Sequence, residues 1–91
     1  MTAIEVDCQS SGDGWTCDVG VADDDGRSHH TVRVRRDDLA RLDPAAADPS
    51  DLVHRSFAFL LEREPPESIL RSFDLTMIGR YFPEYESAIR R

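Results

Sequence analysis

The two cysteines, Cys8 and Cys17, have the most reactive side chains in this chain. A pair of thiols can form a disulfide or take part in redox chemistry when the two positions lie close together. They do not form a C-x-x-C pair, and no neighbouring group would lower the pKa of either thiol. The N-terminal sequence MTAIEVDC lacks the basic segment and apolar core of a secretion signal, so we expect a cytoplasmic protein with reduced thiols. We therefore predict that both cysteines pack in the core, with a disulfide between them as the alternative.

The three histidines are the next candidates, because imidazole is a common metal ligand. His29 and His30 directly follow the acidic turn DDDG, so a site built from imidazole and carboxylate groups can be drawn there. Their spacing matches no structural zinc motif. Neighbouring residues of a strand also point to opposite faces, which prevents the two side chains from holding one ion. His54 is expected on the surface of a helix, and the sequence predicts neither a metal nor a cofactor.

Asp7 and Asp18 form a third pair, because the predicted strand register places them opposite each other on the outer face of a hairpin. Two neighbouring carboxylates can perform acid–base catalysis or hold a divalent ion, but they need burial or a cleft to separate their pKa values. That face is expected to be open, and Arg33 is predicted to lie beside both as their counter-ion. No catalytic-triad spacing, nucleophile elbow or glycine-rich phosphate loop is present. We expect a protein that is not an enzyme, and a small enzyme ranks behind two other functions.

Composition limits the elements that can position these residues. The 91 residues suffice for one domain, 1–91, and a hydrophobic content of 40% suffices for a core. All eleven basic residues are arginine, and twelve of the eighteen acids are aspartate. Either a GC-rich codon usage or a surface adapted to high salt explains this lysine-free, acidic composition. The net charge of -7 disfavours general affinity for nucleic acid or anionic lipid, and no apolar run reaches the roughly 20 residues of a membrane span.

Alternating apolar and polar residues predict two strands, over 4–9 and 15–21, joined by a turn at Gly12-Asp13. Centring the hairpin on that dipeptide brings every apolar residue of the first strand opposite an apolar residue of the second. The predicted pairs are Ser10 with Trp15, Cys8 with Cys17, Val6 with Val19 and Ile4 with Val21. A shift of one residue would destroy this agreement, so the register is well determined.

The turn signal Asp25-Gly26 predicts a second hairpin and a third strand. Centring this hairpin on the dipeptide again gives one apolar face. The predicted pairs are Val21 with His30, Val19 with Val32, Cys17 with Val34 and Asp18 with Arg33. The third strand is then expected to be an edge of the sheet, with Arg35 and Arg36 as its free bases.

The apolar periodicity after Asp48 predicts a central helix over about 49–64, with Asp48 as its N-cap and Pro65-Pro66 as its end. One or two helical turns are predicted over 37–42, and shorter helices are predicted over 67–73, 76–82 and 83–91. The chain thus divides into a β-meander, 1–36, and a helical part, 37–91. The predicted fold is an α+β two-layer sandwich. In it, a three-stranded antiparallel meander, in the order 1-2-3, carries three to four helices on one face.

Two functions agree with these patterns. The first is a protein-interaction or regulatory module, whose partner is another protein or a second copy of the chain in a homodimer. Its candidate surface consists of Arg35, Arg36, Tyr81, Phe82 and Tyr85. The second is a nucleic-acid-binding module that uses Arg33, Arg35 and Arg36 of the third strand, or the segment 67–82, which has the outline of a helix-turn-helix. We rank protein interaction first, because a few phosphate contacts would have to overcome the net charge of -7.

Overall fold

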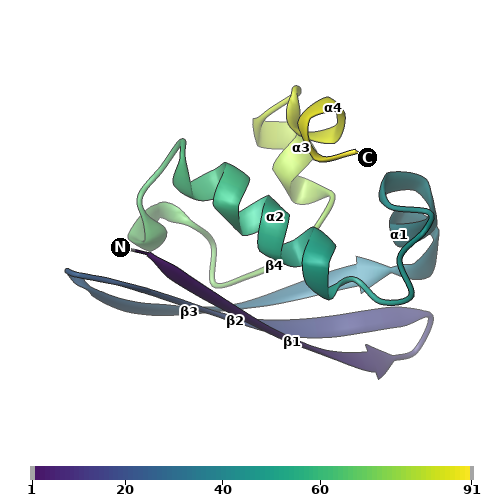
Figure 1. Cartoon of the computed structure of the whole chain (residues 1–91), viewed down its shortest axis with the longest axis horizontal. Helices are drawn as coiled ribbons and strands as arrows, with labels where there is room; N and C mark the ends of the chain where they lie inside the picture. The colour runs from purple at the N-terminus through teal and green to yellow at the C-terminus, as the bar shows by residue number, and fades with distance from the viewer. Residues whose placement is uncertain (1, 91) are drawn as a thin grey trace.

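A computed structural model describes residues 2–90, which fold into two layers (Figure 1). One layer is a four-stranded sheet in the order β1-β2-β3-β4, and the helices cover one face of it. In chain order, the elements are β1 (Ala3–Ser11), β2 (Gly14–Asp23), β3 (Gly26–Arg35), α1 (Arg36–Leu42), α2 (Ser50–Leu61), the 3-10 helix η1 (Pro66–Ser68), β4 (Ser72–Asp74), α3 (Met77–Tyr81) and α4 (Tyr85–Ile89). The predicted α+β class, with an antiparallel meander in the order 1-2-3, is confirmed. Within residues 2–90, no helix is long and apolar enough to cross a membrane.

The register of β1 and β2 is the predicted one. Cys8 lies opposite Cys17, and Val6 lies opposite Val19. The loop between the strands contains Gly12 at φ +61°, a left-handed conformation that glycine adopts without steric cost. The apolar residues of both strands therefore share the face that the helices cover.

The register of β2 and β3 differs from the prediction by two residues. Val19 lies opposite His30 rather than Val32. The two loop residues come one position earlier than Asp25-Gly26, and Gly26, at φ +146°, begins β3. The other predicted pairs of this hairpin, Cys17 with Val34, Val21 with His30 and Asp18 with Arg33, are wrong for the same reason. A shift of two residues leaves every side chain on the same face, so apolar alternation cannot distinguish the two registers.

The segment 67–73 is not the predicted helix. After the single 3-10 turn of η1 the chain is extended, and β4 pairs in parallel with β3, where Val32 lies opposite Phe73. The pairing continues on both sides of β4, because Thr31 N donates to the carbonyl of Arg71 at 2.7 Å and Leu75 N donates to that of Arg33 at 2.9 Å. β3 is therefore not an edge along this stretch, contrary to the prediction. The backbone N–H and C=O groups on this side of β3 need hydrogen-bond partners, and the extended segment around β4 provides them.

α2 begins at Ser50 and ends at Leu61, within the predicted range 49–64. Pro49 occupies the cap position, and Asp48, predicted as the N-cap, lies one position further out. The Asp48 carboxylate accepts the N–H of Ser50 at 2.9 Å. This hydrogen bond to the charged form holds the pKa of Asp48 below its usual value. Asp48 thus still satisfies one of the free N–H groups at the start of the helix.

The core lies between α2 and the sheet. Phe57 on α2 is fully buried, with its ring centroid 5.3 Å from that of His30 and 6.1 Å from that of Phe73. The buried His30 keeps its polar atoms paired. Its Nδ1 donates to the carbonyl of Leu70 at 2.8 Å, and its Nε2 lies 2.9 Å from the hydroxyl of Ser28. One imidazole therefore links β3 to the chain segment that leads into β4.

Candidate interaction surface

A groove with a volume of about 340 Å³ lies between the end of α2 and the segment that runs from η1 through β4 to α3. Buried apolar side chains line it, among them Leu60, Ile69 and Ile78. Residues 69–71 form no helix and lead straight into β4, so they pass the end of α2 without filling the space beside it. The pairing of β4 with β3 therefore creates the groove.

Leu70 and Tyr81 are the exposed apolar side chains of this groove. Leu70 is 49% exposed and Tyr81 is 66% exposed, and no other large hydrophobic residue in 2–90 is exposed. A helix over 67–73 would turn Ile69 and Leu70 together toward the core. The observed backbone buries Ile69 and turns Leu70 outward. The exposure of Leu70 is thus a consequence of the extended conformation, and helical reasoning from the sequence misses it.

The three predicted aromatic site residues separate into two environments. Tyr81 and Phe82 both line the groove, and Phe82 also contacts Phe59 edge-on, with ring centroids 5.9 Å apart. Tyr85 is fully buried, and its hydroxyl lies 2.7 Å from that of Ser56. Tyr85 therefore belongs to the core and offers no contact to a partner. Burial, partly offset by the Ser56 hydrogen bond, raises the pKa of Tyr85 to about 12.

The predicted arginines of the surface lie at the junction of β3 and α1 and do not line the groove. The side chain of Arg35 is 65% exposed, and its Nε lies 3.8 Å from a carboxylate oxygen of Asp74. The guanidinium of Arg36 lies over the ring of Trp15, 4.9 Å from its centroid. The structure therefore groups Tyr81 and Phe82 with the groove and places Arg35 and Arg36 elsewhere.

Arg33 is not the counter-ion of Asp7 and Asp18. Its guanidinium donates to the carboxylate of Asp13 at 2.9 Å and to the carbonyl of Ser11 at 2.7 Å. The prediction is wrong because it depended on the shifted register of β3, in which Asp18 would face Arg33. Asp7 and Asp18 do lie opposite each other as predicted.

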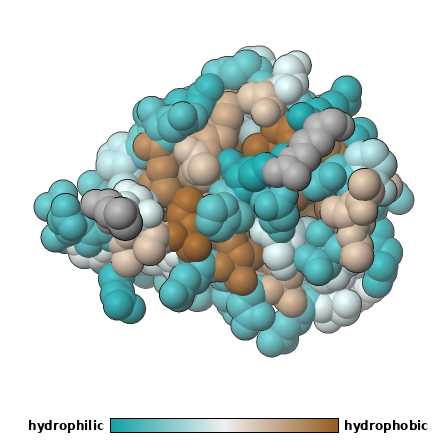
Figure 2. All heavy atoms as spheres, in the orientation of Figure 1, coloured by the Kyte–Doolittle hydropathy of each residue, from teal (hydrophilic) through white to brown (hydrophobic). Residues whose placement is uncertain are grey.

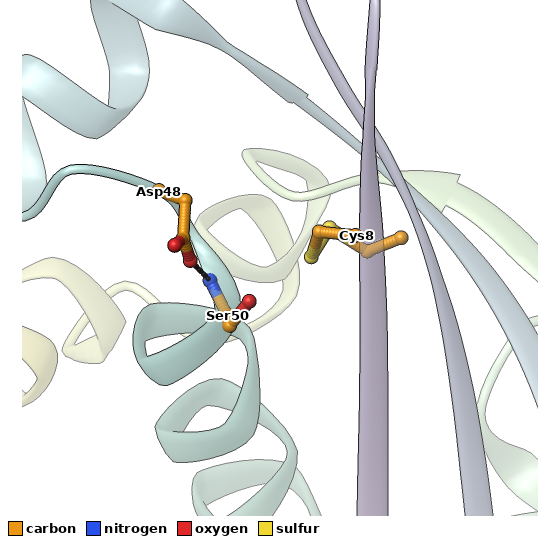
Figure 3. Close-up of a disulfide and its surroundings, with 4 residues drawn as sticks. Cys8, Asp48 and Ser50 are labelled. Atoms are coloured by element: carbon orange, nitrogen blue, oxygen red, sulfur yellow. Dashed lines mark hydrogen bonds between the residues drawn. A yellow bond between two sulfur atoms is a disulfide. The ribbon is translucent and has the colours of Figure 1, made fainter.

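Cys8 and Cys17 form a disulfide between β1 and β2, so the prediction of two reduced thiols is wrong (Figure 3). The register had placed them as direct neighbours, and their Cα atoms are 4.0 Å apart. Cys17 is fully buried, whereas Cys8 is half-buried at the side of the sheet that faces the start of α2, beside Asp48 and Ser50. The bond joins the outermost strand covalently to its neighbour.

The histidines do not converge on one point. His30 is buried in the core and His29 is exposed on the opposite face of β3, as the alternation of a strand requires. His54 is exposed on α2. In the part of the chain that the structure describes, no group of three or more His, Cys, Asp or Glu side chains could hold a metal ion.

The helix-turn-helix interpretation of residues 67–82 is wrong. The segment contains η1, β4 and α3, and α3 has only 5 residues. A helix-turn-helix needs a first helix against which the recognition helix packs. Here the strand β4 stands where the first helix would be, because this segment pairs with β3.

Comparison of the chain with protein-family models, with curated proteins and with solved structures finds no match. The candidate function therefore depends on the chemistry of the groove itself. Its polar side chains are Glu64, Ser68 and, through its hydroxyl, Tyr81, and the remaining side chains of the lining are apolar. This lining suits the burial of apolar groups.

Tyr85→Phe should change the response of the fold to alkaline pH. Because the folded state raises the pKa of Tyr85 from 10.0 to about 12, the unfolded chain ionises first. The stabilisation is complete below pH 10 and is lost as the pH rises toward 12, a change of up to about 2–3 kcal/mol. Urea unfolding at several pH values between about 9 and about 12 should show a steeper loss for the wild type than for the variant. Parallel loss in the two proteins would contradict this assignment.

Proposed function

We propose that this chain is a non-enzymatic protein-interaction module and that the groove is its binding site. One observation carries the proposal: the two large hydrophobic side chains that remain exposed within residues 2–90, Leu70 and Tyr81, both belong to the same groove. Scattered exposed apolar residues need no explanation, but exposed apolar residues that gather at a concave site are typical of contact surfaces. Tyrosine is also enriched where proteins meet, because its ring is apolar and its hydroxyl tolerates water.

The charge at the groove indicates the chemistry of the partner. Glu64 lines the groove and is half-buried, and within residues 2–90 its carboxylate has no ion pair. A base on the partner would compensate it through a charge-assisted hydrogen bond. The occupant we propose is therefore a segment of another protein that presents a large apolar side chain next to an arginine or lysine.

Selection from a displayed library of random peptides tests this proposal. The enriched peptides should contain a large apolar residue beside a base. Their affinity should fall at least tenfold for the double variant Leu70→Ser, Tyr81→Ser, because the apolar contacts are lost. Glu64→Gln should weaken peptides that carry the base and leave peptides without it unaffected.

The matched control is Gln9→Ser with His54→Ser, two exposed changes in β1 and α2 at residues that do not line the groove. Circular dichroism and urea unfolding establish that the variants remain folded. Peptides that bind the groove variant as well as the wild type would overturn the proposal. So would selection of peptides without any apolar residue.

Nucleic-acid binding through the basic residues of β3 is the competing function, and the contacts of these residues weaken it. Arg33 is engaged by Asp13 and Ser11, and Arg36 lies against Trp15. This leaves Arg35 as the most available base of the three. Binding of duplex DNA or structured RNA at about 150 mM salt, abolished by Arg35→Glu combined with Arg36→Glu, would support this alternative over the protein-interaction function.

A further inference from the structure

A second surface, separate from the groove, lies at the outer edge of β1. β1 is the first strand in the order β1-β2-β3-β4, and all nine of its residues pair with β2 on one side only. In Figure 1 it forms the free border of the sheet nearest the viewer. Within residues 2–90, no other backbone group donates to or accepts from it. The outer side of this nine-residue strand therefore has no neighbouring strand within the described residues.

The backbone groups that point outward follow from the hairpin geometry. The two-residue loop is closed by the pair Ser11 and Gly14, which exchanges hydrogen bonds in a hairpin of this type. Hydrogen-bonded and non-hydrogen-bonded pairs alternate along antiparallel strands. The N–H and C=O groups of Ile4, Val6 and Cys8 therefore face away from β2. They form a regular set of donors and acceptors for one further strand.

β1 lacks most of the features that protect edge strands from pairing, and its only charged side chains are those of Glu5 and Asp7. It contains no proline and no basic residue, and its pairing with β2 continues without a bulge from Ala3 to Ser11. At the other side of the sheet, β4 covers part of β3. The chain thus caps one edge and leaves the longer one open.

The two faces beside this edge have different chemistry. On the outer face Glu5 and Asp7 are exposed, Asp18 lies opposite Asp7, and neither β1 nor β2 contains a base. On the inner face Ile4 and Val6 are half-buried against the core. Figure 2 shows hydrophobic atoms along the seam between α2 and β1. An added strand would meet carboxylates on one side and apolar atoms on the other.

We propose that the β1 edge binds an extended segment of a partner protein in which basic residues alternate with apolar ones. The bases would face Glu5 and Asp7, and the apolar residues would extend the core across the seam. A second copy of this chain fits less well. Antiparallel pairing of β1 with itself sets Glu5 opposite Asp7 of the copy when it is centred on Val6. When it is centred on Glu5 or on Asp7, it sets that acid opposite its own equivalent. Charge complementarity therefore selects a basic strand over a homodimer.

Three synthetic nine-residue peptides test the proposal on the intact, disulfide-bonded chain. The first alternates arginine and valine. The second has glutamate in place of arginine. The third repeats the first but carries N-methyl groups on the backbone nitrogens that would face β1. Only the first should bind, at least tenfold more tightly than the other two, and its NMR shift changes should lie in β1 and along α2. The N-methylated peptide separates strand pairing from simple charge attraction, since its charge is unchanged.

Two variants complete the experiment. Val6→Pro removes an outward-facing N–H without breaking the β1–β2 ladder, and Glu5→Arg with Asp7→Arg reverses the charge. Each should reduce the affinity at least tenfold while the Leu70→Ser, Tyr81→Ser groove variant binds normally. Equal binding of the N-methylated peptide, or shift changes confined to the groove, would overturn the proposal. Sedimentation of the free chain as a dimer that Val6→Pro disrupts would also overturn it, in favour of a second copy.

Discussion

Phe57→Ala should lower the free energy of unfolding by about 3–5 kcal/mol. The side chain is fully buried between α2 and the sheet, where its ring faces His30 on β3 and Phe73 on β4. Removing it leaves a cavity at the point where both layers meet, and three elements lose contacts at once. Because a small domain has only about 5–15 kcal/mol of stability, the variant should lose a large fraction of it.

Urea unfolding followed by circular dichroism gives the measurement for Phe57→Ala. Leu70→Ala is the control, since about half of that side chain is already in water and its truncation should cost under about 1 kcal/mol. A loss below about 1 kcal/mol for Phe57→Ala would mean that α2 presents another face to the sheet.

Arg55→Met should cost about 3 kcal/mol, because it leaves a buried carboxylate without its counter-ion. The guanidinium of Arg55 donates to Asp43 at 2.6 Å, to Asp51 at 2.8 Å and to the carbonyl of Ile89. Asp43 is only 7% exposed, so it depends on this arginine more than Asp51 does. The side chain also connects α2 to the end of α1 and to the end of α4.

A double-mutant cycle separates the ion pair from simple loss of packing. Asp43→Asn in the Arg55→Met background should recover part of the stability, since the buried charge is then absent. Arg41→Met is the matched control. It removes an arginine that pairs with Glu86 and Asp38 but is 40% exposed, so the loss should stay within about 1 kcal/mol. Equal losses for the two arginine variants would show that burial of Asp43 contributes nothing.

The alternation of apolar residues was sufficient for the sheet up to the second turn. In the β1–β2 hairpin a shift of one residue exposes the apolar face, and Gly12 marks the loop, so Cys8 and Cys17 were correctly placed opposite each other. The oxidation of that pair was not predictable from the pattern. Whether adjacent thiols join depends on their redox environment, which the spacing of residues does not encode.

The register of β3 against β2 could not be predicted from the local pattern of apolar residues. Two registers that differ by two residues bury the same side chains, and the sequence signal Asp25-Gly26 favoured the wrong one. In the observed register the Asp23 carboxylate accepts the N–H of Asp25 at 2.9 Å, which stabilises a turn one residue earlier. The ladder then runs the whole length of both strands, from Asp23 and Gly26 to Gly14 and Arg35.

The sequence identified some residues of the interaction surface, but the groove itself depends on the tertiary structure. Tyr81 and Phe82 could be selected from the sequence, because they are aromatic residues near the end of a short helix. The groove they line could not, since it depends on Ser72–Asp74 pairing with β3 some 40 residues earlier in the chain. A three-residue strand carries too little periodicity to be recognised locally. Its conformation is decided by the free edge of β3, and that pairing turns Leu70 outward and opens the groove.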